Sequence, residues 1–248
     1  MLGSIPNSAY HRSTMDWEAF FLTIRLAICT ACALVIIGLP LAYWLARTHW
    51  KGRIFIEAIV ALPLVLPPTV LGFYLLLLFG PQTGIGHWLQ FQLGWRLPFT
   101  FTGLLVGSVL YSLPFAVQPF VAAFRFVERE MIEAALADGA SEWVAFRTIT
   151  LPLTWPGVLV GFVLSFSHTI GEFGVVMMIG GNIAGRTRTL SMSIYDQVQS
   201  LNYRQASVTS AVLLVFSFAV LTWTYAYRGN SSLQLLTRRA PNRQKPVI

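Results

Sequence analysis

Five long stretches without a charged residue dominate the sequence, and they predict five membrane-spanning helices. The stretches contain 21 to 26 residues each and cover 26–46, 58–79, 99–124, 148–171 and 205–227. A helix rises about 1.5 Å per residue, so each stretch can cross a hydrocarbon core about 30 Å thick. A membrane β-barrel would instead show short segments of alternating polarity. We therefore expect an all-α integral membrane protein with five transmembrane helices.

The composition excludes the common soluble classes. Hydrophobic residues make up 55% of the 248 residues and charged residues only 11%, against roughly 25% charged residues in a soluble domain. A soluble enzyme and a disordered chain are both excluded by this balance. The net charge of +7 comes from cations between the apolar stretches, where Lys and Arg fix membrane orientation. We expect no nucleic-acid partner.

The distribution of Lys and Arg predicts the orientation. With the N-terminus outside, the inner loops and C-terminal tail carry 11 Lys and Arg residues and the outer segments carry 5. Cytoplasmic loops are normally the richer in Lys and Arg, so we expect the N-terminus outside and the C-terminus in the cytoplasm. The predicted organisation is a polar tail over 1–15, a membrane domain over 16–228 and a basic cytoplasmic tail over 229–248.

A cluster of prolines interrupts the second stretch. Pro63, Pro67 and Pro68 lie within seven residues, and each removes a backbone donor and bends or breaks a helix. Broken helices surround the substrate sites of many transporters. The cluster is therefore a candidate for the pathway or its gate. The alternative is the general enrichment of proline in membrane helices.

The two predicted outer loops also show helical signals. The loop over 80–98 contains Gly84, Gly86, Trp88 and Trp95, which suit a turn and a short helix at the membrane interface. In the loop over 180–204, Leu190, Ile194 and Val198 recur at every fourth position. That spacing predicts a helix with one apolar stripe, lying on a surface.

The segment 128–152 between the third and fourth stretches predicts two short helices joined by a glycine. Acidic residues at its start suit the positive end of a helix, and the Glu133–Ala137 region is strongly helix-forming. Gly139 permits a turn, and Ser141 can cap a second helix. Such a knob suits docking to another protein, although an ordinary amphipathic connector would have the same pattern.

The same segment resembles the EAA loop of ABC import permeases, whose pattern it matches at every position and spacing. The matching residues are Glu133, Ala134, Ala135, Gly139, Ile149, Leu151 and Pro152. We call residues 128–152 the EAA segment. The resemblance implies the type I ABC importer permease (MetI-like) fold and a short helix that couples to an ATPase. It further implies a homodimer of permease subunits, a cytoplasmic ABC ATPase dimer and a periplasmic oxyanion-binding protein.

Two further motifs narrow the resemblance. The stretch 62–72, which reads LPLVLPPTVLG, and the sequence GEFG at 171–174 are similar to permeases of the molybdate, sulfate and tungstate group. The Pro67-Pro68 form is more like the molybdate members. The resemblance implies a multi-pass protein of the bacterial inner membrane that imports a tetrahedral oxyanion, with molybdate ahead of tungstate and of sulfate or thiosulfate.

Glu172 is the one acid well inside an apolar stretch, and His168 lies four residues before it. Residues four apart share a helix face, so the pair suits either a proton relay or a hydrogen-bonded pair that orients the helix end. We favour the structural role. The neighbouring Thr169 offers a neutral donor to an anion path or a bond between helices. Thr169, Glu172 and Phe173 are further candidates for the pathway or gate.

The sequence carries no catalytic signature. It contains no G-x-x-x-x-G-K-[ST] phosphate loop, so ATP hydrolysis is expected in a separate subunit. No cluster of His, Cys, Asp and Glu has metal-ligand spacing, and we expect no metal, cofactor or catalytic residue. A membrane-embedded enzyme is thereby disfavoured. A proton-coupled secondary carrier remains the rival from another class, with His168 and Glu172 as its ionisable groups.

Overall fold

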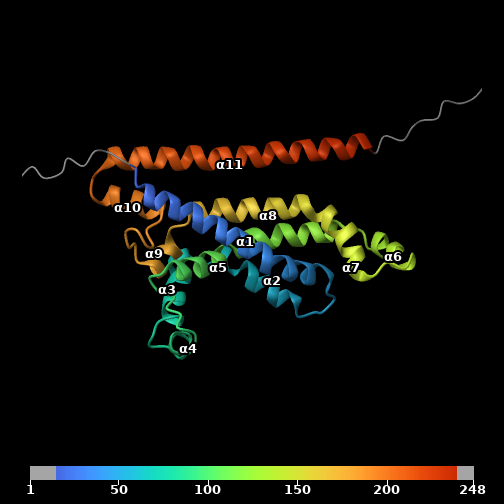
Figure 1. The fold of residues 1–248 in the computed structure, drawn as a ribbon, viewed down its shortest axis with the longest axis horizontal. Coiled ribbons are helices and arrows are strands. Elements are labelled where there is room, and N and C mark those ends of the chain that lie inside the picture. The colour runs from blue at the N-terminus through green and yellow to red at the C-terminus, as the bar shows by residue number, and fades with distance from the viewer. Residues whose placement is uncertain (1–14, 239–248) are drawn as a thin grey trace, which may run out of the picture.

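Helices form the whole of the regular structure in residues 15–238, the part of the chain that the computed structural model describes (Figure 1). This part contains no strand, and the predicted all-α class is confirmed. In chain order the elements are α1 (Trp17–Arg47), α2 (Arg53–Ala61), the 3₁₀ turn η1 (Leu62–Leu64), α3 (Pro68–Leu78), α4 (Gly84–Leu93), α5 (Phe101–Phe126), α6 (Arg129–Ala137), α7 (Glu142–Ala145), the π-helical turn η2 (Phe146–Thr150), α8 (Leu151–Gly171), α9 (Gly174–Gly180), α10 (Leu190–Gln199) and α11 (Tyr203–Arg238).

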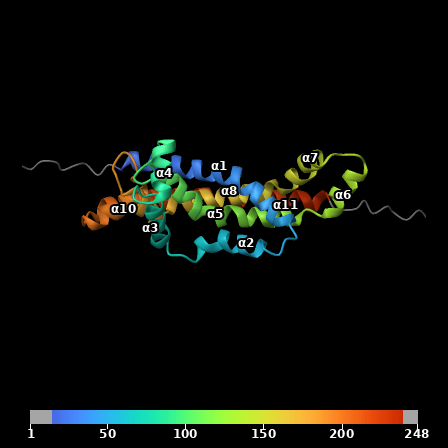
Figure 2. The same ribbon diagram turned by 90° about the horizontal axis from the view of Figure 1, so that it is seen from below.

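Three long helices, α1, α5 and α8, pack against one another and form the centre of the bundle (Figures 1 and 2). Phe120 on α5 is fully buried between them. It fits because glycines face it from both sides, Gly38 on α1 and Gly161 on α8. A Cβ atom added to Gly161 would lie 2.4 Å from Cε1 of Phe120. Small residues thus allow close approach of helix backbones, as is usual in membrane bundles.

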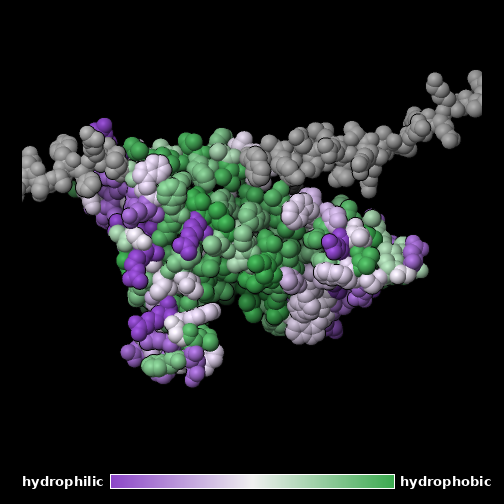
Figure 3. Space-filling model, viewed as in Figure 1, coloured by the Kyte–Doolittle hydropathy of each residue, from purple (hydrophilic) through white to green (hydrophobic). Residues whose placement is uncertain are grey.

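Four single helices are long and apolar enough to cross a membrane. Figure 3 shows hydrophobic residues across the middle of the visible face and hydrophilic residues towards both ends, as expected for a membrane-embedded bundle. The candidate spans agree with four of the five predicted stretches. They are Trp17–Arg47, Phe101–Phe126, Glu142–Gly171 and Tyr203–Thr222.

The second predicted span, 58–79, is not one continuous helix. Helical segments Arg53–Leu64 and Pro68–Leu78 meet at an angle of 110°. Pro67 is extended, with φ −54° and ψ 134°, and Pro68 is the first residue of α3. Because neither proline has a backbone N–H and the residue before a proline avoids the α conformation, the helix cannot continue through this point. The expected proline break is therefore a sharp bend that divides the span.

Short helices occupy both predicted outer loops. Thr83 caps α4 by accepting a hydrogen bond from the Gly86 N–H at 3.2 Å. The helix predicted around Leu190 is α10, but its buried face differs from the predicted stripe. Leu190, Ser193 and Gln197 are buried, whereas Val198 is 42% exposed. Polar contacts explain the difference, because α10 packs against the start of α1, where the Thr23 hydroxyl accepts a hydrogen bond from the Leu190 N–H at 2.8 Å.

The predicted terminal tails fall largely outside the described residues, which exclude 1–14 and 239–248. The proposed boundary at position 228 lies within α11. The start of α1 and the end of α11 lie at opposite ends of the bundle (Figure 1), as an odd number of membrane crossings requires. The direction in which the bundle crosses the membrane stays a prediction.

Candidate functional site

The EAA segment folds as the predicted pair of helices and projects from one end of the bundle (Figure 1). Its first helix, α6, has no buried residue. Glu133 is held by Arg129 one turn earlier, whose Nε donates to the carboxylate at 2.9 Å. Of the two alanines that follow, Ala134 is exposed and Ala135 is partly buried. An ion pair between residues four apart, such as Arg129 and Glu133, stabilises an exposed helix by about 0.2–0.5 kcal/mol.

Gly139 ends α6 in a left-handed conformation, with φ +91°. The Ala140 N–H donates to the Ala135 carbonyl at 3.0 Å, and the Gly139 N–H donates to the Leu136 carbonyl at the same distance. This pair of bonds is the Schellman motif, which requires a residue that tolerates positive φ. A Cβ atom added at Gly139 would meet no atom within 4 Å. The glycine is therefore required by backbone conformation and not by packing within this chain.

The second helix of the segment continues directly into the bundle. Ser141 caps α7 by accepting a hydrogen bond from the Val144 N–H at 3.3 Å. The π-helical turn η2 contains Ile149 and leads into α8, which begins with Leu151 and Pro152. Because Pro152 has no N–H, the regular hydrogen bond at that position is missing. Even so, residues 142–171 form one helical run, so the segment is joined to α8 without a loop.

Apolar side chains of α6 and α7 stand uncovered around this knob. Met131 and Leu136 on α6 are 44% and 38% exposed, and Trp143 and Val144 on α7 are 67% and 46% exposed. Exposed apolar residues gathered on a protruding element are typical of a protein interaction surface. The segment therefore has the physical properties of a docking element.

The proline cluster and the GEFG motif meet at the opposite end of α8. There α8 ends at Gly171, Glu172 is extended, and α9 begins at Gly174. A Cβ atom on Gly174 would lie 2.7 Å from Cβ of Pro68, and one on Gly72 would lie 2.9 Å from Cα of Val175. The short helices α3 and α9 thus touch backbone to backbone. Pro63 is also buried, but it belongs to η1 and therefore lies on the other side of the bend from Pro68.

Glu172 lies buried in the break between α8 and α9, with 4% of its surface exposed. Neither carboxylate oxygen has a hydrogen bond of good geometry. The side chains of Ser108 and Tyr111 on α5 lie near this carboxylate. The backbone of Glu172 is bonded on both sides: the carbonyl accepts a hydrogen bond from the Ser191 hydroxyl at 2.6 Å, and the N–H donates to the Thr169 carbonyl at 3.3 Å. The adjacent Phe173 packs against the Tyr195 ring, with ring centroids 5.1 Å apart.

His168 does not pair with Glu172 as the hydrogen-bonded alternative required. Its Nδ1 lies 2.9 Å from the Ser112 hydroxyl on α5, and its ring stacks on Phe115 with centroids 3.9 Å apart. The Thr169 hydroxyl also lies 3.1 Å from Ser112 and donates to the Ser165 carbonyl at 2.9 Å. Thr169 thus serves the bond between helices, the more common use of such residues in membranes.

Comparison with known families decides the class of this protein. The family described as "Binding-protein-dependent transport system inner membrane component" matches residues 38–229, which include both the EAA segment and the α3–α9 contact. The chain belongs to this family. It is therefore an inner-membrane permease component of a transport system.

Relatives that match most of this permease are named as permease proteins of molybdenum or sulfate transport systems. It is 48% identical over 216 residues to the molybdenum transport system permease protein ModB of Azotobacter vinelandii, covering 87% of this chain and 96% of that protein. The ModB of Escherichia coli K12 is 32% identical over 84% of this chain and 93% of its own length. The sulfate transport system permease protein CysT of the same strain is 33% identical, covering 82% and 73%.

Solved structures confirm the permease fold. A chain of a bacterial alginate ABC transporter, in complex with a periplasmic protein bound to alginate pentasaccharide, has a TM-score of 0.67 at 21% identity. The match covers 86% of this permease and 78% of that chain. A chain of an amino acid ABC transporter has a TM-score of 0.60 at 17% identity, covering 86% and 92%. The predicted fold of an ABC importer permease is thus correct.

The structure separates the predicted site residues of the permease into two groups. The EAA residues lie at one end, and Pro67, Pro68, Glu172 and Phe173 lie at the other, joined by α8 over roughly 30 Å. Sequence reasoning missed Ser112, which links α5 to α8, and Arg47, which lines a cavity beside α6. In the sequence, Arg47 is simply one of the 11 Lys and Arg residues of the predicted inner segments.

Proposed function

We propose that this permease is the membrane-spanning subunit of an ATP-driven importer for molybdate. The observation that carries the proposal is the 48% identity, over nearly the whole of both chains, to a molybdenum transport permease. Molybdate, tungstate and sulfate share a tetrahedral shape and the same charge, and relatives named for sulfate transport match at 32–35% identity. Sulfate and tungstate are therefore the alternatives that the test below must separate.

The exposed EAA segment supports a cytoplasmic ATPase dimer as the partner at that end. Its knob offers apolar side chains, a rigid Schellman turn and a direct helical connection to the bundle. Glu133, Ala134, Ala135 and Gly139 form the docking surface in this proposal, and Ile149, Leu151 and Pro152 fix the joint to α8. Two copies of the permease assemble around one pathway, and a periplasmic binding protein delivers the anion at the opposite end.

The proposed mechanism is alternating access driven by the ATPase. Closure of the ATPase dimer moves the EAA segment, and because residues 142–171 form one helical run, the movement reaches the α3–α9 contact. A transporter of this kind needs two packings of similar free energy. The short helices α3 and α9 begin at Pro68 and Gly174, next to the breaks at Pro67 and Glu172. The N-terminus of a helix carries partial positive charge, which suits passage of an anion.

ATP hydrolysis by the complete transporter tests the proposal. The permease is reconstituted in liposomes with its companion ATPase, and binding protein is added empty or loaded with molybdate, tungstate or sulfate. Molybdate-loaded protein should stimulate hydrolysis the most. Greater stimulation by sulfate would reassign the substrate, and equal rates with empty and loaded protein would remove the oxyanion assignment. Uptake that follows a proton gradient without ATP would favour the secondary carrier.

Glu172→Gln should preserve transport. The side chain is buried and has no hydrogen bond of good geometry and no ion pair among the described residues, so the amide keeps the shape of the side chain and breaks no pairing. We expect anion uptake in proteoliposomes within about threefold of the native rate, a change in activation free energy of about 0.7 kcal/mol or less. Complete loss of uptake from an intact complex would instead support a proton relay through His168 and Glu172.

A further inference from the structure

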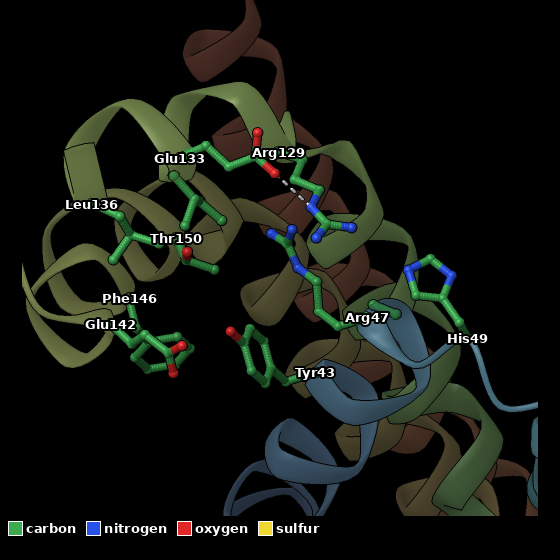
Figure 4. A pocket seen from close by; sticks show the side chains of 11 residues that line it. Tyr43, Arg47, His49, Arg129, Glu133, Leu136, Glu142, Phe146 and Thr150 are labelled. Atoms are coloured by element: carbon green, nitrogen blue, oxygen red, sulfur yellow. Dashed lines mark hydrogen bonds and ion pairs between the residues drawn. The ribbon is translucent and has the colours of Figure 1, made fainter.

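A cavity separates the end of α1 from the EAA segment. Its volume is about 470 Å³, and its lining comes from α1, α6, α7 and η2, together with His49 just after α1 (Figure 4). Cavities of about 300–1,000 Å³ are typical of small-molecule sites. Three of the lining residues carry basic side chains, Arg47, His49 and Arg129, and two carry carboxylates, Glu133 and Glu142.

Arg47 lines this cavity without an ion-pair partner among the described residues. It is the last residue of α1, and its Nε and Nη2 atoms are buried without a hydrogen-bond partner. Among residues 15–238 it forms none of the ion pairs, and its guanidinium carbon lies 6.0 Å from the centre of the Tyr43 ring. The residue as a whole is half-buried. Because guanidinium nitrogens that are shielded from water and lack an acceptor are unfavourable, these two nitrogens favour an anion as their partner.

The carboxylates of the cavity do not supply that anion. Glu133 accepts a hydrogen bond from Nε of Arg129 at 2.9 Å, and this bond leaves the two terminal nitrogens of Arg129 as further donors. In Figure 4 the guanidinium groups of Arg47 and Arg129 lie next to each other, while the Glu142 carboxylate lies apart, beside Phe146. Two guanidinium groups thus line the same cavity, and the Glu133 carboxylate is bonded to only one of them.

We propose that this cavity binds a tetrahedral oxyanion through Arg47 and Arg129, with His49 at its edge. One planar guanidinium group can donate two parallel hydrogen bonds to two oxygens of a phosphate-like anion. Two such groups together can therefore bind several oxygens of one anion. The chemistry is that of a phosphate group. It is supplied either by the headgroup of an anionic lipid or by a free oxyanion such as inorganic phosphate or molybdate.

Such an anion would join α1 to α6. Arg47 belongs to the central bundle, whereas Arg129 and Glu133 belong to the docking helix, so one ligand would hold the EAA segment in a fixed position against the bundle. This consequence rests on the proposed function, in which the EAA segment must move with the ATPase. An occupied cavity then lowers the rate of coupled ATP hydrolysis. Binding itself is measured without transport, so the two proposals fail separately.

The test measures anion binding to the purified full-length permease in two arms. In the first, titration calorimetry follows inorganic phosphate and then molybdate added to the permease in phosphatidylcholine nanodiscs. In the second, native mass spectrometry counts the phosphatidylglycerol molecules retained by permease taken from mixed vesicles. The variants are Arg47→Gln and, as a control for charge, Lys51→Gln, because Lys51 is exposed and lies outside the cavity lining.

Saturable binding in at least one arm is expected, weakened at least tenfold in Arg47→Gln and less than twofold in Lys51→Gln. The arm that responds identifies the source of the anion. If Arg47→Gln does not purify as a monodisperse protein, Arg129→Gln replaces it, because that side chain is 68% exposed. Absence of binding in both arms, or equal binding by the native protein and the cavity variant, would overturn the proposal.

Discussion

Gly139→Trp is expected to abolish coupled ATP hydrolysis and transport while the permease itself stays folded. A Cβ atom at this position meets nothing within 4 Å, so the indole has room in the isolated chain. The left-handed φ of +91° adds strain of roughly 1–2 kcal/mol, too little to unfold the bundle. In the complex, the indole would stand where the docking surface meets the ATPase. We expect at least a tenfold loss of molybdate-stimulated hydrolysis in proteoliposomes.

Gly139→Ala is the matched control, because it carries the same backbone strain without the bulk. It should assemble with the ATPase and retain most of the stimulated hydrolysis. If the alanine and tryptophan variants lose activity equally, then turn geometry and not docking explains the loss. Normal transport by Gly139→Trp would contradict the docking surface altogether.

Gly174→Ala is expected to disrupt the contact between α3 and α9. Its methyl group would lie 2.7 Å from Cβ of Pro68 and 3.1 Å from the backbone nitrogen of Thr69. Neither atom belongs to a flexible side chain, so a helix must shift. Overpacking of this kind destabilises by about 1–3 kcal/mol, equivalent to a fall in melting temperature of roughly 2–12 °C. Thermal unfolding of the purified permease measures the fall, and anion uptake should drop at least tenfold.

Gly171→Ala provides the comparison three residues away. A Cβ atom on Gly171 meets nothing within 4 Å, and the residue ends α8 in a helical position. Alanine there should change stability by less than about 0.5 kcal/mol. A melting temperature that is the same for both variants would show that the α3–α9 contact is looser than the structure places it.

The membrane helices were predictable because their signal is local. A stretch of more than 20 uncharged residues has few alternatives to a membrane-spanning helix, and four such stretches became helices at nearly the expected positions. The sharpness of the bend at Pro67 was not predictable, because a proline in a membrane helix often causes only a kink. The break at Glu172 contains no proline, so the sequence has no comparable signal for it, and it lies where α9 packs on α3.

The EAA segment was predictable from local signals, whereas the contacts around His168 and Thr169 were not. Gly139 and Ser141 are turn and cap residues whose conformations follow from their own chemistry, and the structure has both as expected. The partners of His168 and Thr169 depend on how α5 is rotated about its axis, which places Ser112 between them. A single sequence carries no information about that rotation. For the same reason, the sequence did not indicate that Arg47 lines a cavity, because that depends on where α6 lies relative to the end of α1.

The glycine contacts between α3 and α9 also restrict how the bundle can rearrange. Backbones this close cannot slide past each other without collision, so the two short helices must travel as one rigid body. At their N-terminal ends the two helices connect to the rest of the chain through non-helical joints, at Val65–Pro67 and at Glu172–Phe173, and at their C-terminal ends they continue into the loops before α4 and α10. Hinges are usually a few residues of this kind, at the ends of helices. Any opening of the permease at this end therefore has to move α3 and α9 together and to change the packing of α9 against α5, where a Cβ atom added to Gly180 would lie 2.6 Å from Cδ2 of Leu104.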